Sequence, residues 1–600
     1  MAGKTLDIES FFGTAGVAGP DALAYKIAGM FNEWNSHRMD WLREKHELRN
    51  YLFATDTKST SNSTLPWKNS TTVPKLTQIR DNLHANYMAA LFPNRRWLRW
   101  EGEHESDEVK QKREAIENYI QTKLIQDRAE ITLSNLLLDF IDYGNVFATV
   151  EWVDESRENP ETGEIITGYI GPRIVRINPN DIVFNPLSNT FTHTPKILRT
   201  LKNLGELAKE VKRLPDGDYK NKMQKVLDKT TALRRSAGML EPSDSLISDG
   251  FTVDGFGSYQ LYLNSDYVEI LTFYGDVYDV DTGVLKEGHV IEVVDRAFIV
   301  RDEPNQNWTT SDLFHHAGWR QRPKNLYAMG PLDNLVGMQY RIDHLENLKA
   351  DVFDMIAFPV QKISGFVEDY VYEPGAKIFV GDDGDVDFMS PDTTALNAEL
   401  QIEELQRRME ELAGAPREAM GIRSPGEKTA FEVQLLDNAA SRLFLNKIQH
   451  FEKVFLEPLL NDMLAVARQN MQANDVVRSV DSEVDAIVFS TVTKDDITAD
   501  GTLRPRGASH FAERANQLQN VLSLMNSPVA QDESVAVHMS GKKIAKLIEE
   551  LSDLDDFEIY GDNIRVIEAA ETQQIAAAGQ EQAEVNAEVP PGITEGDLQF

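Results

Sequence analysis

The chain has 600 residues, of which 41% are hydrophobic and 9% aromatic, so it can build two to four folded domains. It carries 96 acidic and 61 basic residues, and its net charge of −35 argues against a protein that grips nucleic acid by neutralising phosphates. Cysteine is absent, which excludes disulfides, thiolate catalysis and cysteine metal sites. No signal-peptide core and no apolar run of bilayer length is present, so we expect a soluble protein.

The N-terminal third reads as helices followed by a small sheet. Apolar side chains at helical spacing predict helices over 20–54 and 74–91, and two more over 106–128 and 129–142. Gly144 then breaks the pattern, and the segment NVFATVEWVDE has the composition of a half-buried strand. Further strands end in the Asn-Pro turns of RIVRINPNDIVFNP. The pattern predicts a mixed α+β fold, mainly helical.

A short basic segment in this region has two interpretations. Arg95, Arg96 and Arg99 alternate with Trp97 and Trp100. Such interleaving can bind nucleic acid through stacking and charge. It can equally be a strand whose tryptophans pack inward while its arginines are solvated, and we favour this second interpretation.

The middle of the chain combines a β element with a helix that carries a narrow apolar seam. Residues 203–236 are helical and highly charged, and 267–303 alternate in polarity as a small antiparallel β element does. A helix is predicted over 331–357, with Lys349 at one position of its seam. The apolar seam residues are Leu335, Met338, Ile342, Leu345, Val352 and Ile356. Their three- and four-residue steps are typical of a coiled coil, so the seam faces either the chain's own core or helices of neighbouring copies.

Helices and short strands alternate after Pro359. That proline begins a strand, and residues 395–413 form a Glu-rich helix that Gly414 ends. A loop rich in glycine and proline then leads into a helix of about forty residues ending at Met471. Pro458 should kink or end that helix, because proline lacks an amide donor and crowds the preceding turn.

The last hundred residues are acidic and weakly patterned. A strand is expected near 484–490, and helices over 513–526 and 540–552. From about residue 566 the sequence becomes a polar tail that we expect to be partly disordered.

Catalytic motifs are not apparent. The pairs Gly3-Lys4 and Gly541-Lys542 lack the rest of a phosphate-loop pattern. His315 and His316 are adjacent and should point apart, which does not suit a shared metal. We find no nucleophile elbow and no dinucleotide fingerprint. The sequence therefore predicts a structural protein with no catalytic residue, no cofactor and no metal.

Three segments resemble the portal (head–tail connector) proteins of tailed bacteriophages, particularly the short-tailed (podovirus) type. Residues 319–360 begin WRQRPKNLYAMGPLDN and continue into a helix with Gln-Tyr-x-x-Asp and Asn, ending at a proline. The segment GAPREAMGIRSPGEKTAFEV is similar to the family's Gly-x-Pro loop followed by Thr-Ala-x-Glu-Val, here beginning at Thr429. The strand RIVRINPNDIVFNP is similar to a family strand, and the order of elements agrees over roughly 20–505.

The resemblance implies a subunit divided into wing, stem, clip and crown, which assembles as a ring, usually of twelve copies. The implied regions are 1–229, N-terminal part of the wing; 230–261, first stem helix; 262–330, clip; 331–358, second stem helix; 359–505, C-terminal part of the wing with channel loop 414–428 and long helix 428–471; and 506–600, crown and acidic tail. The stem would pack through the seam residues named above.

The resemblance also implies partners and a location. Double-stranded DNA would pass through the ring during packaging and ejection, near loop residues Arg417, Glu418, Arg423, Glu427 and Lys428. The ring would sit at one capsid vertex of the virion after assembly in the host cytoplasm. It would contact the capsid and scaffold proteins, the packaging ATPase (terminase) and a tail adaptor, without touching a membrane.

Two other interpretations remain open. The chain could be another structural virion protein, such as a tail adaptor or an internal core protein. It could also be a nucleic-acid-processing enzyme with divergent motifs. Oligomeric state separates the portal from the first alternative, and hydrolytic activity separates it from the second.

Overall fold

The computed structural model is a mixed α+β protein, as the sequence predicts. It contains two compact units, residues 1–477 with 491–507 and residues 478–490 with 508–600. The structure describes residues 20–56, 58, 60, 69–92, 97–102, 107–158, 165–166, 168–214, 216–236, 267–279, 283–294, 298–305, 314–365, 367–368, 378–389, 393–413, 444–471, 475–480, 487–498, 501–507, 517–518, 521, 523–525 and 541–551.

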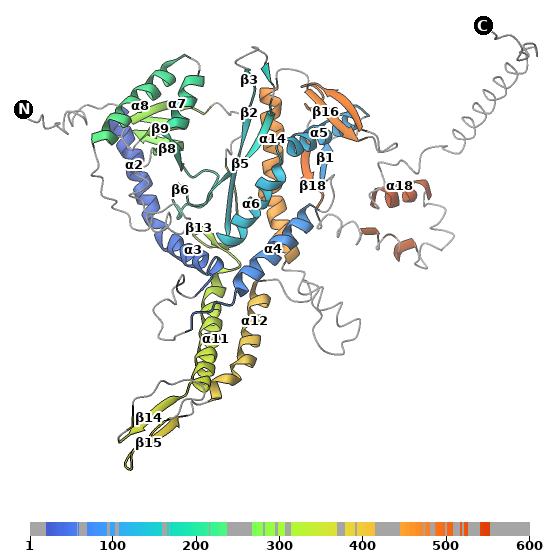
Figure 1. Ribbon diagram of the computed structural model, residues 1–600. Helices are drawn as coiled ribbons and strands as arrows, with labels where there is room; N and C mark the ends of the chain where they lie inside the picture. Colours follow the sequence, from blue (N-terminus) through green and yellow to red (C-terminus); the bar gives the residue numbers. More distant parts are fainter. Residues whose placement is uncertain are drawn as a thin grey trace, which may run out of the picture. The chain divides into compact units, whose positions relative to one another are not determined.

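The described part of the first unit contains ten α-helices, of which α11 and α12 extend away from the sheets of the body (Figure 1). They are α2 (Pro20–His37), α3 (Met39–Leu52), α4 (Lys75–Leu91), α5 (Asp107–Gln126), α6 (Ala129–Asp142), α7 (Leu204–Arg213), α8 (Asp218–Ser236), α11 (Val336–Ala357), α12 (Glu399–Ala413) and α14 (Glu457–Asn470). Two short 3-10 helices, η3 (Asp333–Leu335) and η4 (Thr393–Ala398), precede α11 and α12.

The helix predicted over 20–54 is two helices, because Arg38 interrupts it. Arg38 lies between α2 and α3, and its side chain is buried. Its guanidinium donates hydrogen bonds to the backbone oxygens of Pro179 at 3.0 Å and Ile182 at 2.8 Å. The break therefore places a buried cation against backbone carbonyl groups of a loop. Because the apolar spacing continues across Arg38, the sequence pattern could not predict the break.

The largest sheet has five antiparallel strands in the order β10-β9-β8-β7-β6. Its strands are β6 (Ile182–Phe184), β7 (Lys196–Asn203), β8 (Tyr267–Asp279), β9 (Val284–Val294) and β10 (Phe298–Pro304). The antiparallel element expected near 267–303 is present. It does not stand alone as a separate 262–330 region, however, because β8 pairs with β7 along its length, from Asn203 opposite Tyr267 to Lys196 opposite Tyr274.

A second sheet has three strands in the order β11-β2-β5. Its strands are β2 (Asn145–Asp154), β5 (Ile170–Ile177) and β11 (His315–Gly318). Gly144 turns the chain from α6 into β2 with φ +67°, and a Cβ there would lie 2.3 Å from the nitrogen of Gly330. Only glycine fits this close approach.

Five two-stranded ribbons complete the described strands. They are β1 (Leu98–Gly102) with β18 (Gly501–Pro505), β3 (Arg157–Glu158) with β4 (Ile165–Ile166), β12 (Arg320–Arg322) with β13 (Asn325–Met329), β14 (Val360–Ser364) with β15 (Asp385–Met389), and β16 (Asp475–Val480) with β17 (Ile487–Val492). Trp97 and Trp100 are buried at β1, which supports the interpretation of that segment as a packed strand.

The main core joins α3, α4, α5 and α6 to α14 and to the start of α11. Phe140 of α6 lies 5.0 Å, between ring centroids, from Phe451, and Leu459 and Leu460 are fully buried in the same cluster. Because these helices bury one apolar face in the core, the spacing of apolar residues in the sequence predicts where the helices lie.

The long helix predicted over 428–471 is described from residue 444 onward. It does not end at Pro458. A π-helical turn, η5 (Glu452–Leu456), immediately precedes that proline, and α14 continues to Asn470. The extra residue of the turn relieves the clash that proline would cause in a regular helix.

Helix α18 (Gly541–Leu551) belongs to the second unit and confirms the helix expected over 540–552. Most of the predicted first stem helix, 230–261, lies outside the described residues. Among the helices described, none is long and apolar enough to cross a membrane.

Candidate functional site: the stalk and its anchor

Residues 336–413 form a hairpin-shaped segment of the first unit that we call the stalk. Helix α11 enters it, the ribbon β14–β15 reverses the chain, and α12 returns alongside α11 (Figure 1). Lys349 of α11 donates to Glu399 at the start of α12 at 2.6 Å, and this contact joins the two helices. The stalk is therefore one supersecondary element in which the two helices support each other.

The predicted seam on α11 divides into two parts. Leu335, Ile342, Leu345 and Val352 are buried, and Met338 is partly buried against the main core. Ile356, at the other end of the same seam, is 43% exposed. The interpretation that the seam faces the chain's own core is thus correct for its N-terminal part and wrong for its last residue.

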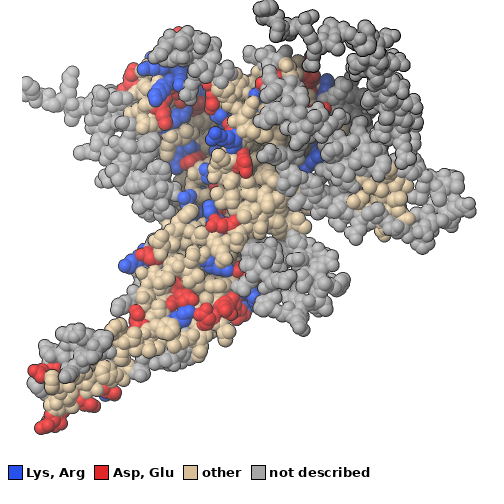
Figure 2. Space-filling model, turned by 45° about the vertical axis from the view of Figure 1, so that its right-hand side comes forward, with Lys and Arg blue, Asp and Glu red and all other residues tan. Residues whose placement is uncertain are grey.

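Exposed apolar side chains gather in the stalk beyond the buried part of the seam. Of the 24 large apolar side chains that are exposed in the described chain, 12 belong to residues 348–412. They are Leu348, Phe353, Met355, Ile356, Phe358, Ile363, Phe379, Val380, Phe388, Met389, Leu400 and Leu412. In Figure 2 this part of the molecule is mainly tan, with acidic side chains at its far end. Single exposed apolar side chains are common on protein surfaces, but half of those in the described chain belong to this one segment.

Helix α11 carries four polar residues on the flank away from its apolar seam. They bind an extended segment, residues 69–74, that we call the strap. The residues are Gln339, Asp343, Asn347 and Asp351, which are spaced four apart and so lie on one face of the helix. Each side chain forms a hydrogen bond with the backbone of the strap or of the first turn of α4. These bonds take the place of those that a neighbouring β-strand would supply to an extended segment.

Asn347 and Gln339 each make two of these bonds. Asn347 accepts from the amide of Thr71 at 2.7 Å and donates to its carbonyl at 2.8 Å. Gln339 accepts from the amide of Leu76 at 3.2 Å and donates to the carbonyl of Val73 at 2.5 Å. The pairing supplies partners for partly buried backbone groups of Thr71 and Val73 and for the buried amide of Leu76.

We call these four residues the polar ladder. Two of them, Asp343 and Asp351, are carboxylates, and Asp343 is fully buried. Its Oδ1 accepts from the amide of Val73 at 3.0 Å and from Gln339 at 2.9 Å, whereas its Oδ2 has no hydrogen-bond partner. Burial raises the pKa of this carboxyl to about 6, although the two hydrogen bonds oppose the rise. The ladder thus contains one group whose charge is costly in the folded state.

A buried ion pair fixes the returning helix. Lys75, the first residue of α4, pairs with Glu410 of α12, and both side chains are almost fully buried. The strap and the start of α4 therefore contact both stalk helices, α11 through the polar ladder and α12 through this ion pair.

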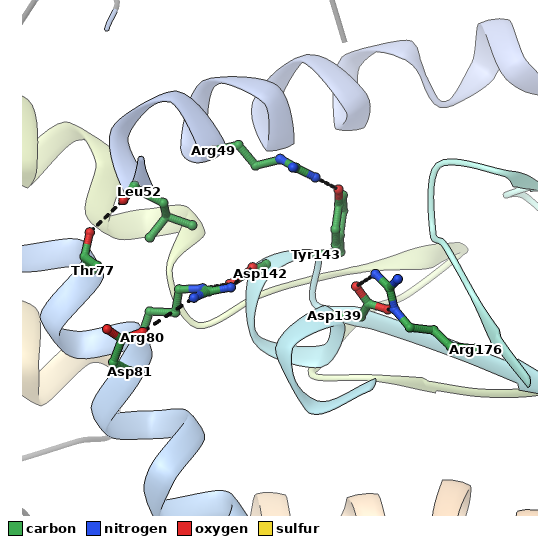
Figure 3. Close-up of polar contacts among 9 residues, drawn as sticks. All are labelled: Arg49, Leu52, Thr77, Arg80, Asp81, Asp139, Asp142, Tyr143 and Arg176. Atoms are coloured by element: carbon green, nitrogen blue, oxygen red, sulfur yellow. Dashed lines mark hydrogen bonds and ion pairs between the residues drawn. The ribbon is translucent and has the colours of Figure 1, made fainter. Parts of the chain in front are cut away.

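On the body side of the strap, arginine–carboxylate pairs join α4 to α6 and β5 to α6 (Figure 3). Arg80 of α4 binds Asp142 of α6 with two bonds of 2.7 and 2.8 Å. Arg176 of β5 binds Asp139 of α6 with bonds of 2.5 and 2.7 Å, and burial raises the pKa of Asp139 to about 6. These forked pairs fix orientation between elements. They leave no open position for a substrate, and we assign them a structural role.

The other sequence candidates fall in different places. The channel-loop residues Arg417, Glu418, Arg423, Glu427 and Lys428 lie outside the described residues, as do Arg95 and Arg96. His315 and His316 do point apart. The first bonds Asp462 at 3.2 Å and the second bonds Asn145 at 3.1 Å. Within the described ranges, no three His, Asp or Glu side chains are grouped as metal ligands.

The polar ladder on α11 was not anticipated from the sequence. The available signal was the run of polar residues at four-residue spacing on the flank away from the apolar seam. No protein-family model matches the chain, and no curated protein matches it.

Proposed function

We propose that the chain is the subunit of a portal, the ring-shaped head–tail connector of a short-tailed bacteriophage. The observation that carries the proposal is the stalk, which is anchored by buried polar contacts at one end and exposes apolar side chains toward the other. Apolar surface that the folded chain leaves uncovered is stabilised by contact with further copies. One such contact, repeated by rotation, closes into a ring.

The regions of this proposed portal differ from those expected from the sequence alone. Helices α11 and α12 are the two stem helices, since they run side by side and share the anchor. The ribbon β14–β15 between them takes the place of the clip, in preference to residues 262–330, whose strands belong to a sheet shared with β6 and β7. The remainder of the first unit is the wing, and residues after 506 are the crown.

The charge of the chain suits a channel. About a dozen copies at −35 each would make an acidic ring that repels phosphates from most of its wall and prevents DNA from adsorbing as it passes. In this proposal the ring lies at one capsid vertex of the virion and itself hydrolyses nothing. The far end of the stalk meets the packaging ATPase and later the tail adaptor, and the wing meets the capsid and scaffold proteins.

Negative-stain microscopy of the purified full chain tests the proposal. We expect rings with a central hole. Uniform small particles at every concentration would contradict it and would favour another structural virion protein. Hydrolysis of ATP or of nucleic acid that survives substitution of Lys4 and Lys542 would instead favour an enzyme.

The channel loop has its own test. Reversing Arg417 and Arg423 to Glu should leave the rings intact and impair packaging or retention of DNA. Loss of the rings would mean that these arginines pair between subunits, in which case the loop is an assembly contact.

A further inference from the structure

Basic side chains occur along the hairpin β12–β13 and on the helical segment whose Lys447 contacts Trp319, and we call them the cationic cluster. It consists of Arg320, Arg322, Lys324, Lys447 and His450. The first three lie within one five-residue stretch, and the last two lie one helical turn apart on the helix that is described from residue 444 onward. Two segments more than a hundred residues apart in the sequence therefore contribute cations to one place.

Trp319 connects these two segments. Its ring is buried, and both the Arg320 guanidinium and the Lys447 ammonium lie over it, 5.2 and 4.7 Å from the ring centroid. Lys447 also donates a hydrogen bond to the Trp319 carbonyl. The aromatic face and the carbonyl stabilise the ammonium group without neutralising it.

None of the four permanent cations in the cluster pairs with a carboxylate of the described chain. Arg322 is bonded to a backbone carbonyl, that of Tyr327, and Arg320 and Lys324 are exposed. Elsewhere in this acidic protein arginines are commonly paired, as Arg80 and Arg176 are. A cluster of uncompensated cations in a chain with a net charge of −35 needs an explanation.

Two members of the cluster have lowered pKa values, with burial as the first cause and a neighbouring cation as the second. Burial, together with the nearby Arg320, lowers the pKa of Lys447. Burial, together with Lys447, lowers the pKa of His450. A merely solvated face would spread its cations apart and expose them, whereas here Lys447 and His450 are half-buried next to other positive groups. The arrangement is suited to an external anion that supplies the missing negative charge.

We propose that the cationic cluster binds the phosphate backbone of double-stranded DNA. Guanidinium groups bind phosphate oxygens with paired hydrogen bonds, and lysines add charge at longer reach. The inference rests on the proposed function, because a portal is the setting in which this chain would meet duplex DNA. It names a contact separate from the channel loop: a small basic area on an otherwise repelling surface, which holds DNA weakly and without regard to sequence.

Binding of a fluorescent duplex of about 25 base pairs, measured by anisotropy over a salt series, tests the assignment. The test variant is R320E/K324E, which changes two exposed cations. The matched control is K209E/K212E, which changes two exposed, unpaired lysines of α7 by the same charge. We expect the test variant to weaken binding roughly tenfold or more and to reduce the salt slope by about 2, while the control changes binding by less than about threefold.

Several results would overturn the proposal. Equal losses of affinity in the test and control variants would show that only the overall charge matters. Failure of the unmodified chain to bind the duplex would show that DNA is not the ligand of the cluster. Displacement of DNA by poly-glutamate of matched charge would instead indicate an acidic protein as the partner. If R320E/K324E fails to fold, R320Q/K324Q serves in its place, with the same expected direction. Ring formation, scored separately by microscopy, tells failure of the portal function from failure of this contact.

Discussion

The two ends of α11 carry similar apolar residues but differ in what covers them. Ile342, near the start of the helix, is fully buried in the chain's own core, whereas Ile356 is 43% exposed. Both belong to the same three-four spaced seam. The difference teaches that one sequence pattern can be covered by the chain's own core over its first turns and left exposed over its last.

The polar contacts of α11 follow the same division. Gln339, Asp343 and Asn347 hold the strap beside the buried part of the seam. Phe353, Ile356 and Phe358 extend beyond it. The buried end therefore combines apolar burial with several directional bonds, whereas the exposed end keeps the contacts of Asp351 and Asp354 with Asn69 beside uncovered apolar side chains.

The largest expected effect separates the two isoleucines. Ile342→Ala should lower the free energy of unfolding by about 2 to 5 kcal/mol, because it removes fully buried methyl groups and leaves a cavity. Ile356→Ala should change it by less than about 0.5 kcal/mol when measured on the isolated subunit. Denaturant unfolding of both variants under dissociating conditions gives the comparison. Equal losses would mean that Ile356 is covered within its own chain.

A smaller effect is expected from the strap. Asn347→Ala removes both hydrogen bonds to the partly buried backbone groups of Thr71, and at about 0.5 to 1.5 kcal/mol for each bond we expect a cost of about 1 to 3 kcal/mol. Hydrogen exchange should show faster exchange at residues 69–76 and little change in α6. Asn461→Ala, which removes bonds of α14 to Leu503, is the matched control, and it should leave the strap unaffected.

Part of this fold could be predicted from the sequence alone. Apolar spacing identified α11 and α4 to within a few residues, because their burial pattern follows the helical period. It could not reveal that β8 pairs with β7, since the two strands are separated by α7 and α8 and strand alternation carries no information on partners. Nor could it show which end of the seam is covered, since Ile342 and Ile356 are the same residue type. The ladder was missed because single polar residues on a helix usually face water.

The smallest effect expected is a pH dependence that Asp343 contributes. Burial raises its pKa in the folded chain to about 6 from an ordinary value of 3.8, so the folded chain binds its proton more tightly than the unfolded chain does. Stability from this group is therefore gained as the pH falls through about 6 and lost as the pH rises through it. Between about pH 7.5 and 5.5 the gain should be about 1 kcal/mol. Asp343→Asn should remove this component, and an unchanged pH profile would show that another group is responsible.

The central claim is that the exposed end of the stalk is covered by neighbouring copies. Native mass spectrometry of the wild-type chain beside the variant F353S/I356S tests it most directly, since both substitutions lie on exposed side chains of one helix. We expect the wild type to give a closed oligomer of about twelve subunits and the variant to give mainly monomers that remain folded. Rings of equal abundance in both proteins, or monomers in both, would contradict the account.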